Sequence, residues 1–350
     1  MKPNIAKLVS CILLLVSLTV IVFCDPLSAQ AENSGDTIPP GGGYAATGQK
    51  EGMGYISKLY DASNGLVTSD ANDVLCVSDG SVLIGGYSGI TRYDGTSFTK
   101  LDTSDGLTSG RALFEDSLHR IWVGTNDNGV VVLEGSKRTH FTDQEKLTSM
   151  SIRGFAEDRE GNVFIATTAG VCYADTRMAL HVLDDERLKE ERILRLDSDT
   201  QGRIYGYTKS GFAFLIEDKQ ISAIYSSEEL GTEKITTIMA DPLNDGYVYI
   251  GTSGNAVYYG EFGSKADKLE CISVSPMSDI HFISYNCGRV WITSTTAAGY
   301  LDDNRKIHIL DDIPLILKRA KTEKSISAPT VTASMWLTEM ISNTSAAAEG

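Results

Sequence analysis

Residues 107–133 read LTSGRALFEDSLHRIWVGTNDNGVVVL, and they hold the clearest copy of a pattern that recurs along the chain. The pattern begins with Leu-x-Ser/Thr and a short strand of alternating apolar residues. A turn with acidic residues and Gly follows, then an aromatic or β-branched strand, a Gly and a third strand. Similar segments start at Asn64 (NGLVTSDANDVLCVSDGSVLIGGYSGITRYDG) and at Lys146 (KLTSMSIRGFAEDREGNVFIATTAGVCYAD). Self-similarity at a fixed period indicates a repeat architecture.

Three fainter copies follow the first three. They read RLDSDTQGRIYGYTKSGFAFLIED, IMADPLNDGYVYIGTSGNAVYYG and ISYNCGRVWITSTTAAGYLDD. A small residue or Thr ends the second strand of each copy, at spacings of 39, 42, 40, 45 and 42 residues. These positions are Gly85, Gly124, Ala166, Gly206, Gly251 and Thr293. The chain therefore contains about six copies of a unit of roughly 41 residues.

Each unit has room for four short strands. In the second copy, we expect strands at residues 112–115, 121–125, 130–134 and 139–141, separated by turns rich in Gly, Asp, Asn and Ser. Four antiparallel strands per repeat make a propeller blade. A stacked solenoid is the alternative, but its units carry helices or shorter coils, and residues 54–314 show no sustained helical period. The predicted fold is an all-β propeller of four-stranded antiparallel blades, with six blades readable over residues 54–314.

Closure of the ring calls for a seventh blade. Residues 55–60 (YISKLY) resemble residues 97–101 (SFTKL), so we interpret them as an orphan fourth strand that completes the last blade. The remaining strands of that blade would come from residues 315–350. Residues 335–338 (MWLT) repeat the second-strand motif faintly, whereas the Asp-Gly turn and the third strand are lacking. We interpret this tail as a degenerate or truncated seventh blade.

The N-terminus has the organisation of an export signal. Lys2 and Lys7 precede an uncharged apolar run over residues 8–24, and residues 29–31 (AQA) form a cleavage site of small residues. Residues 1–31 are predicted to be a signal peptide, with an uncleaved anchor as the alternative. Residues 32–53, rich in Gly, Pro and Ala, are predicted to be a flexible linker. The chain is thus expected to be exported, on the periplasmic or extracellular side.

Charge and cysteine spacing exclude several classes of function. The formal net charge of −15 would repel a phosphate backbone, so no nucleic-acid partner is expected. No Cys or His pair has metal-ligand spacing, and no catalytic or phosphate-binding motif is present, so neither a metal nor a cofactor nor a catalytic residue is predicted. Cys76 and Cys172 fall on expected strands as buried thiols, and a Cys271–Cys287 bridge is an open alternative in an oxidising compartment.

The quoted segments resemble the two-component regulator propeller repeat, which has the form L-x-S, then D-x-x-G-x-(L/I)-W-(I/V)-G-T, then a Gly-led strand. Residues 107–133 are the best instance. The likeness extends over about residues 55–303 and weakens in the fourth and sixth copies, where Tyr205 replaces the Trp and the Asp is lost. The resemblance implies an extracytoplasmic sensor region of a bacterial membrane histidine kinase or diguanylate cyclase. No kinase or cyclase motif follows residue 314, so no enzymatic output is carried over to this chain.

Candidate binding residues follow from the geometry of a propeller. If the first strand of each repeat is innermost, the loop that enters it opens on one mouth of the central channel. The polar residues of these loops are Asp70, Asn72, Arg111, Arg153, Glu191 and Arg192. We expect a ligand-binding sensor whose partner is a small molecule, a glycan or a protein, with a homodimer as a further option. Membrane contact is expected only through the N-terminal segment or a C-terminal helix absent from the sequence. An exported propeller lyase or hydrolase and a structural scaffold are the alternatives.

Overall fold

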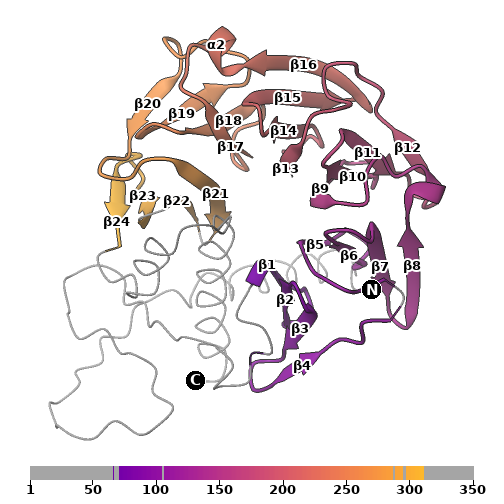
Figure 1. Cartoon of the computed structure of the whole chain (residues 1–350). Coiled ribbons are helices and arrows are strands. Elements are labelled where there is room, and N and C mark those ends of the chain that lie inside the picture. Colours follow the sequence, from indigo (N-terminus) through magenta and orange to yellow (C-terminus); the bar gives the residue numbers. More distant parts are fainter. Residues whose placement is uncertain (1–65, 67–70, 105, 287, 295–296, 311–350) are drawn as a thin grey trace, which may run out of the picture. The chain divides into compact units, whose positions relative to one another are not determined.

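The structure is a computed structural model that describes residues 66, 71–104, 106–286, 288–294 and 297–310. Within these residues, six four-stranded antiparallel sheets follow one another along the chain, and in each sheet the strands pair in chain order. Figure 1 shows the first strands of the sheets facing a common centre, with the fourth strands toward the periphery. The chain is therefore a β-propeller with blades 1 to 6, as predicted. The orphan strand at residues 55–60 and the seventh blade at residues 315–350 lie outside the described residues.

Blades 1 to 3 are built from twelve strands and one short helix. Blade 1 consists of β1 (Ala71–Cys76), β2 (Val82–Gly86), β3 (Gly89–Tyr93) and β4 (Phe98–Lys100). Blade 2 consists of β5 (Ala112–Glu115), β6 (Ile121–Gly124), β7 (Val130–Glu134) and β8 (Lys137–Phe141), followed by the 3₁₀ helix η2 (Asp143–Glu145). Blade 3 consists of β9 (Ile152–Glu157), β10 (Val163–Thr167), β11 (Val171–Ala174) and β12 (Leu180–Val182).

Blades 4 to 6 repeat the same arrangement. Blade 4 consists of β13 (Ile193–Ser198), β14 (Ile204–Thr208), β15 (Phe212–Glu217) and β16 (Gln220–Ser226), followed by the helix α2 (Ser227–Leu230). Blade 5 consists of β17 (Ile235–Ala240), β18 (Tyr247–Thr252), β19 (Ala256–Glu261) and β20 (Glu270–Ser273). Blade 6 consists of β21 (Ile280–Asn286), β22 (Arg289–Ser294), β23 (Ala298–Leu301) and β24 (Ile307–Ile309). No helix among the described residues is long and apolar enough to cross a lipid bilayer.

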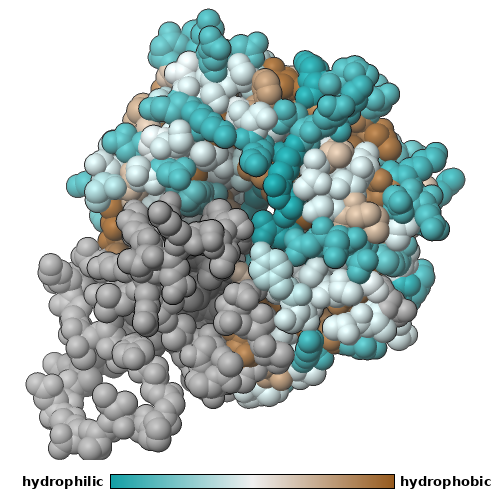
Figure 2. All heavy atoms as spheres, in the orientation of Figure 1, coloured by the Kyte–Doolittle hydropathy of each residue, from teal (hydrophilic) through white to brown (hydrophobic). Residues whose placement is uncertain are grey.

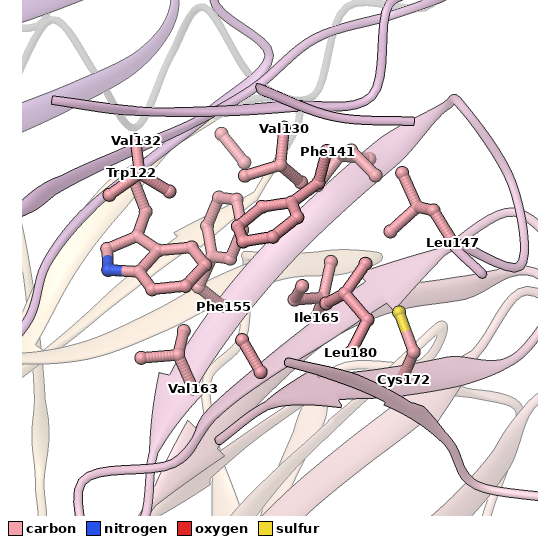
Figure 3. Close-up of a cluster of buried hydrophobic side chains, with 13 residues drawn as sticks. Trp122, Val130, Val132, Phe141, Leu147, Phe155, Val163, Ile165, Cys172 and Leu180 are labelled. Carbon is pink, nitrogen blue, oxygen red and sulfur yellow. The ribbon is translucent and has the colours of Figure 1, made fainter. Parts of the chain in front are cut away.

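The aromatic residues of the second strands β6, β10, β14 and β18 pack between neighbouring blades. Trp122 of β6 is fully buried, and its ring centroid lies 6.1 Å from that of Phe155 in blade 3. Figure 3 shows the cluster around these two rings, in which side chains of blade 2 meet Val163, Ile165 and Cys172 of blade 3. Because each blade buries its apolar face against the next, the sheets stabilise one another through aromatic and aliphatic contact.

Strand pairing corrects one position of the repeat alignment. Ile152 of β9 pairs with Thr167, and Ile235 of β17 pairs with Thr252. In blade 4 the corresponding pair is Ile193 and Thr208, so Tyr207, not Gly206, is equivalent to Gly251. The assignment of Gly206 was one residue early because the sequence comparison was anchored on the small residue.

The turn between the first and second strands of a blade contains a residue with a positive φ. Gly161 lies between β9 and β10 with φ +81°, which suits the left-handed region that Gly adopts without strain. In blade 2 the turn uses His119 at φ 60° instead.

Cys76 and Cys172 differ in their exposure to solvent. Cys172 is fully buried, as expected, whereas Cys76 is exposed at the end of β1, where the strand leaves the sheet for the turn. Cys271 lies on β20 and Cys287 lies outside the described residues, so the bridge between them stays a prediction.

Candidate functional site

The inner strands of blades 1, 4, 5 and 6 line a cavity of about 410 Å³. Its walls are residues 72–74 of β1, Arg195, Asp197 and Ser198 of β13, Met239 and Ala240 of β17 with Pro242 beyond it, and residues 282–286 of β21. Figure 2 shows hydrophilic residues gathered around the centre of the described blades. The cavity is therefore part of the central channel and presents charged and aromatic side chains together.

A β-bulge near the start of the inner strand recurs from blade to blade. In β1 the pairing skips Asn72, and in β9 it skips Arg153. The register shifts in β13, β17 and β21 skip Leu194, Thr236 and His281 in the same way. In blade 2, Ala112 pairs with Gly124 and the backbone N of Arg111 also donates to the carbonyl of Gly124, which gives Arg111 the equivalent place. A bulge redirects a side chain from the sheet, so the repeat places Asn72, Arg111 and Arg153 at one end of the channel.

Three of the predicted site residues form a cluster of positive charge at this end, which we call the arginine cluster: Arg111, Arg153 and Arg192. Burial, and then the positive charges of Arg192 and Arg111, lower the pKa of the Arg153 guanidinium to about 10. Burial also lowers the pKa of Arg111, and Arg192 contributes in the same direction. Arg111 and Arg153 are therefore within electrostatic range of Arg192, although the three residues come from three blades.

Asn72 joins the arginine cluster from blade 1. Its side chain is 3% exposed, and its Oδ1 accepts a hydrogen bond from Arg111 Nη1 at 3.3 Å. Its Nδ2 is buried without a hydrogen-bond partner among the described residues, and so are the Nε atoms of Arg153 and Arg192. Arg153 Nη2 donates to Ser151 Oγ at 3.1 Å. The site thus holds buried donors that no described residue satisfies.

One described residue of the predicted set, Glu191, is not brought into the cluster. The Glu191 carboxylate accepts a hydrogen bond from Ser210 Oγ, which lies in the turn between β14 and β15, at 3.0 Å. It is not among the charges that shift the pKa of Arg111 or Arg153. Asp70 lies outside the described residues. The predicted ring of mixed charge is therefore, in its described part, a group of arginines and one amide.

The channel wall carries two further acids and a cation that the sequence did not single out. The guanidinium of Arg195 lies 4.1 Å from the ring centroid of Phe282. Asp73 Oδ2 accepts a hydrogen bond from Leu113 N at 2.8 Å, and Asp197 Oδ2 accepts one from Ala240 N at 2.8 Å. Burial raises the pKa of both carboxyls, against the opposing charge of Arg195. Each Asp joins the inner strand of one blade to that of the next, which gives it a structural role.

Tyr87 also belongs to the arginine cluster's surroundings and was missed. It is 52% exposed between β2 and β3, and it is one of the groups that influence the pKa of both Arg111 and Arg153. Its phenol supplies a further polar group beside the guanidiniums. The available signal was its place in the turn just beyond the end of the second strand, because that turn lies at the same end of the blade as the start of the inner strand.

The histidines do not gather at this end of the channel. His140, His181 and His308 lie on the fourth strands β8, β12 and β24, at the periphery of their blades. His119 lies in the turn between β5 and β6, and His281 lies on β21. Among the described residues, no three His, Cys, Asp or Glu side chains form a group suited to hold a metal ion.

Comparison with known proteins gives a likeness of fold. No protein-family model matches the chain, and no curated protein matches it by sequence. Among solved structures, the extracellular domain assigned to the hybrid two component system BT3049 from B. thetaiotaomicron is similar, with a TM-score of 0.60 and 15% identity. The match covers 79% of this chain and 38% of that chain, so the likeness extends over less than half of the BT3049 domain.

Two other propellers are similar to a comparable degree. A streptogramin B lyase has a TM-score of 0.59 and 12% identity, with 71% of this chain and 86% of that chain covered. A structure of YCF48 bound to D1 peptide has a TM-score of 0.56 and 13% identity, with 71% and 85% covered. An extracellular signalling domain, a lyase and a peptide-bound protein thus share this architecture, and at these identities the likeness establishes the propeller fold alone.

Proposed function

We propose that this chain is a ligand-binding sensor propeller that works outside the bacterial cytoplasm, with its binding site at the arginine cluster. The observation that carries the proposal is the set of buried donors on Asn72, Arg153 and Arg192 for which the described blades supply no partner. A buried donor without a partner costs free energy, so such groups are retained where a ligand completes them. The stability of the fold gives no reason to place three guanidiniums from three blades close together.

The signalling part of the proposal rests on two supports of different kinds. The repeat resembles the two-component regulator propeller repeat over most of the blades. The fold is also similar to that of the BT3049 extracellular domain. Export is supported by the charge pattern, apolar run and small-residue site of residues 1–31. In such a sensor, a bound ligand would hold blades 1 to 4 together at the inner strands, and this change in inter-blade contact is what an output partner would detect.

A binding measurement tests the proposal. The full chain is screened by thermal unfolding against sugars, amino acids, short peptides and organic acids, because a ligand that binds only the folded state raises the melting temperature. A true site ligand loses its effect in Arg153→Gln and keeps it in Arg177→Gln, since Arg177 is exposed in the turn between β11 and β12. Ligands that stabilise both variants equally would place the binding site elsewhere.

A further inference from the structure

The arginine cluster stands out against the charge of the whole chain. The protein carries a formal net charge of −15, and acidic residues outnumber basic ones by 46 to 31. Three positive side chains nevertheless lie together at one end of the channel, where burial and mutual repulsion lower the pKa of Arg111 and Arg153. Gathering like charges in a partly buried place is unfavourable unless something of opposite charge offsets it.

Five other arginines show how this protein pairs a guanidinium with a carboxylate. Ion pairs of 4.0 Å or less join Arg92 to Asp79, Arg120 to Asp116, Arg187 to Asp185, Arg203 to Asp199 and Arg305 to Glu270. No member of the arginine cluster forms such a pair with a carboxylate of the described residues. Asp73 influences Arg111, but its carboxylate accepts its two hydrogen bonds from backbone N atoms, those of Val74 and Leu113. The cluster therefore has an excess of positive charge.

The free donors match one kind of chemical group. Arg153 Nε and Arg192 Nε are N–H donors of planar guanidiniums, and Asn72 Nδ2 is a neutral donor beside them. Guanidiniums bind carboxylate, sulfate and phosphate oxygens through paired hydrogen bonds, and each such bond is strengthened by charge. A neutral hydroxyl would satisfy the donors but would leave the repulsion between the arginines unchanged.

We propose that the arginine cluster binds an oxyanion group of a small soluble ligand, with Arg153 and Arg192 donating to its oxygens and Asn72 donating beside them. This inference rests on the proposed function and specifies the ligand class of the same site. Tyr87, which influences both Arg111 and Arg153, would supply a further donor. Because Asn72 also lines the cavity that holds Arg195 on Phe282, the ligand's uncharged body would extend from Asn72 toward this aromatic wall.

Calorimetric titration of the full chain tests the ligand class. The probes are gluconate and sulfate as oxyanions, with glucose as the uncharged match of gluconate, in a low-salt buffer free of phosphate. Gluconate and sulfate are expected to bind, and glucose to bind at least about tenfold more weakly than gluconate. Raising the ionic strength should weaken the binding of both anions, since the attraction is electrostatic.

Variants locate the site. Arg153→Gln and Arg192→Gln are each expected to weaken anion binding at least about tenfold, since each removes a charged donor. Arg177→Gln changes the net charge equally and should leave binding unchanged. If Arg153→Gln does not fold, Arg153→Lys and Arg192→Gln report on the same site, and Arg153→Lys should weaken binding because it loses the planar fork.

The outcomes separate the two proposals. Anion binding that falls in the cluster variants but not in Arg177→Gln supports the oxyanion site. Anion binding that is equal in all variants overturns it. If neither anion binds while an uncharged ligand from the screen binds and depends on Arg153, the ligand class is wrong and the ligand-binding function stands. If no compound, charged or uncharged, depends on the cluster, both proposals fail.

Discussion

Glu157, the last residue of β9, accepts two hydrogen bonds from Ser117 in the turn of the preceding blade, from its N at 2.8 Å and from its Oγ at 2.6 Å. One repeat earlier, Glu115 at the end of β5 accepts from the N and Oγ of Ser78 in the same way. The repeat thus carries a polar connection that joins the first turn of one blade to the inner strand of the next. It lies at the opposite end of the inner strands from the arginine cluster.

Replacing Glu157 with Ala is expected to lower the free energy of unfolding by about 2 kcal/mol, because two hydrogen bonds to a carboxylate are lost. Glu160→Ala is the matched control. Glu160 lies three residues later with a side chain that is 68% exposed and 3.9 Å from Lys219, so its loss should cost no more than about 0.5 kcal/mol. Chemical denaturation of both variants measures the difference. Equal losses would show that the connection between blades 2 and 3 contributes nothing specific.

Asp116 forms a second recurring arrangement, inside one blade. Its Oδ2 accepts from Arg120 Nε at 2.6 Å and from Trp122 Nε1 at 2.7 Å, and all three side chains are buried. Asp116→Asn leaves the Arg120 charge buried without its counter-ion, so we expect a loss of about 3 to 5 kcal/mol in unfolding free energy. Glu134→Gln breaks a pair with Lys137 whose side chains are mostly exposed, and should change stability by less than about 1 kcal/mol. A small effect of Asp116→Asn would mean that the carboxylate is not needed to hold the indole and guanidinium in place.

Most of the fold was readable from the sequence because each strand carries a local signal. The second copy was predicted nearly to the residue: three of its strands begin where expected, and only β8 begins earlier, at Lys137. Its start was missed because Lys137 and Arg138 look like loop residues, whereas edge strands often carry such charges. Gly206 was aligned one residue early because Tyr207 fills a place where other blades have a small residue.

Gly129, at the turn before β7, should tolerate no side chain. Its φ is +72°, and an added Cβ would lie 2.2 Å from the carbonyl oxygen of Phe141, which is backbone and cannot swing away. Gly129→Ala is therefore expected to cost at least about 3 kcal/mol in unfolding free energy. Gly135→Ala also has a positive φ, +58°, but meets no atom within 4 Å, so it should cost about 1 kcal/mol. Thermal unfolding of both variants separates the cost of the steric contact from the cost of the backbone conformation. Similar losses of stability in the two variants would show that the contact with Phe141 adds nothing.

The candidate site was less readable than the fold. Loop position brought Asn72, Arg111, Arg153 and Arg192 to attention as neighbours of one channel mouth, because each precedes or begins an inner strand. Which side chain turns toward the channel is decided by a bulge, and a one-residue bulge leaves no mark in a pattern of alternating residues. Arg195 and Asp73 follow the bulge directly and were therefore overlooked, and Glu191 was included although it bonds to Ser210.

Export makes a prediction about the N-terminus. Cleavage after Ala31 would give an exported chain that begins at Glu32, with the corresponding lower mass. Ala29→Arg should block cleavage, because the site requires small residues. Gln30→Glu changes the residue between Ala29 and Ala31 and should leave cleavage intact. Intact mass spectrometry of the chain from fractionated cells distinguishes these products. A full-length chain in the membrane fraction would favour the uncleaved anchor.

Asp73 gives a prediction about pH with a defined sign. Burial raises the pKa of its carboxyl in the folded state above the ordinary value of 3.8. Between these two pKa values the folded state binds more protons than the unfolded state, so this group's contribution to stability falls as pH rises and is unfavourable at neutral pH. Asp73→Asn keeps an oxygen that can accept from Leu113 N and removes the charge. The stability of Asp73→Asn relative to the unchanged chain should therefore be higher at pH 7 than at pH 4.

Asp94→Asn is the control and should show the opposite trend, because hydrogen bonds from Ser97 and Thr96 lower the pKa of Asp94. Denaturation at the two pH values measures both differences. If the relative stability of Asp73→Asn is lower at pH 7 than at pH 4, the attraction of Arg195 and Arg111 for the charged carboxylate outweighs the cost of burying it.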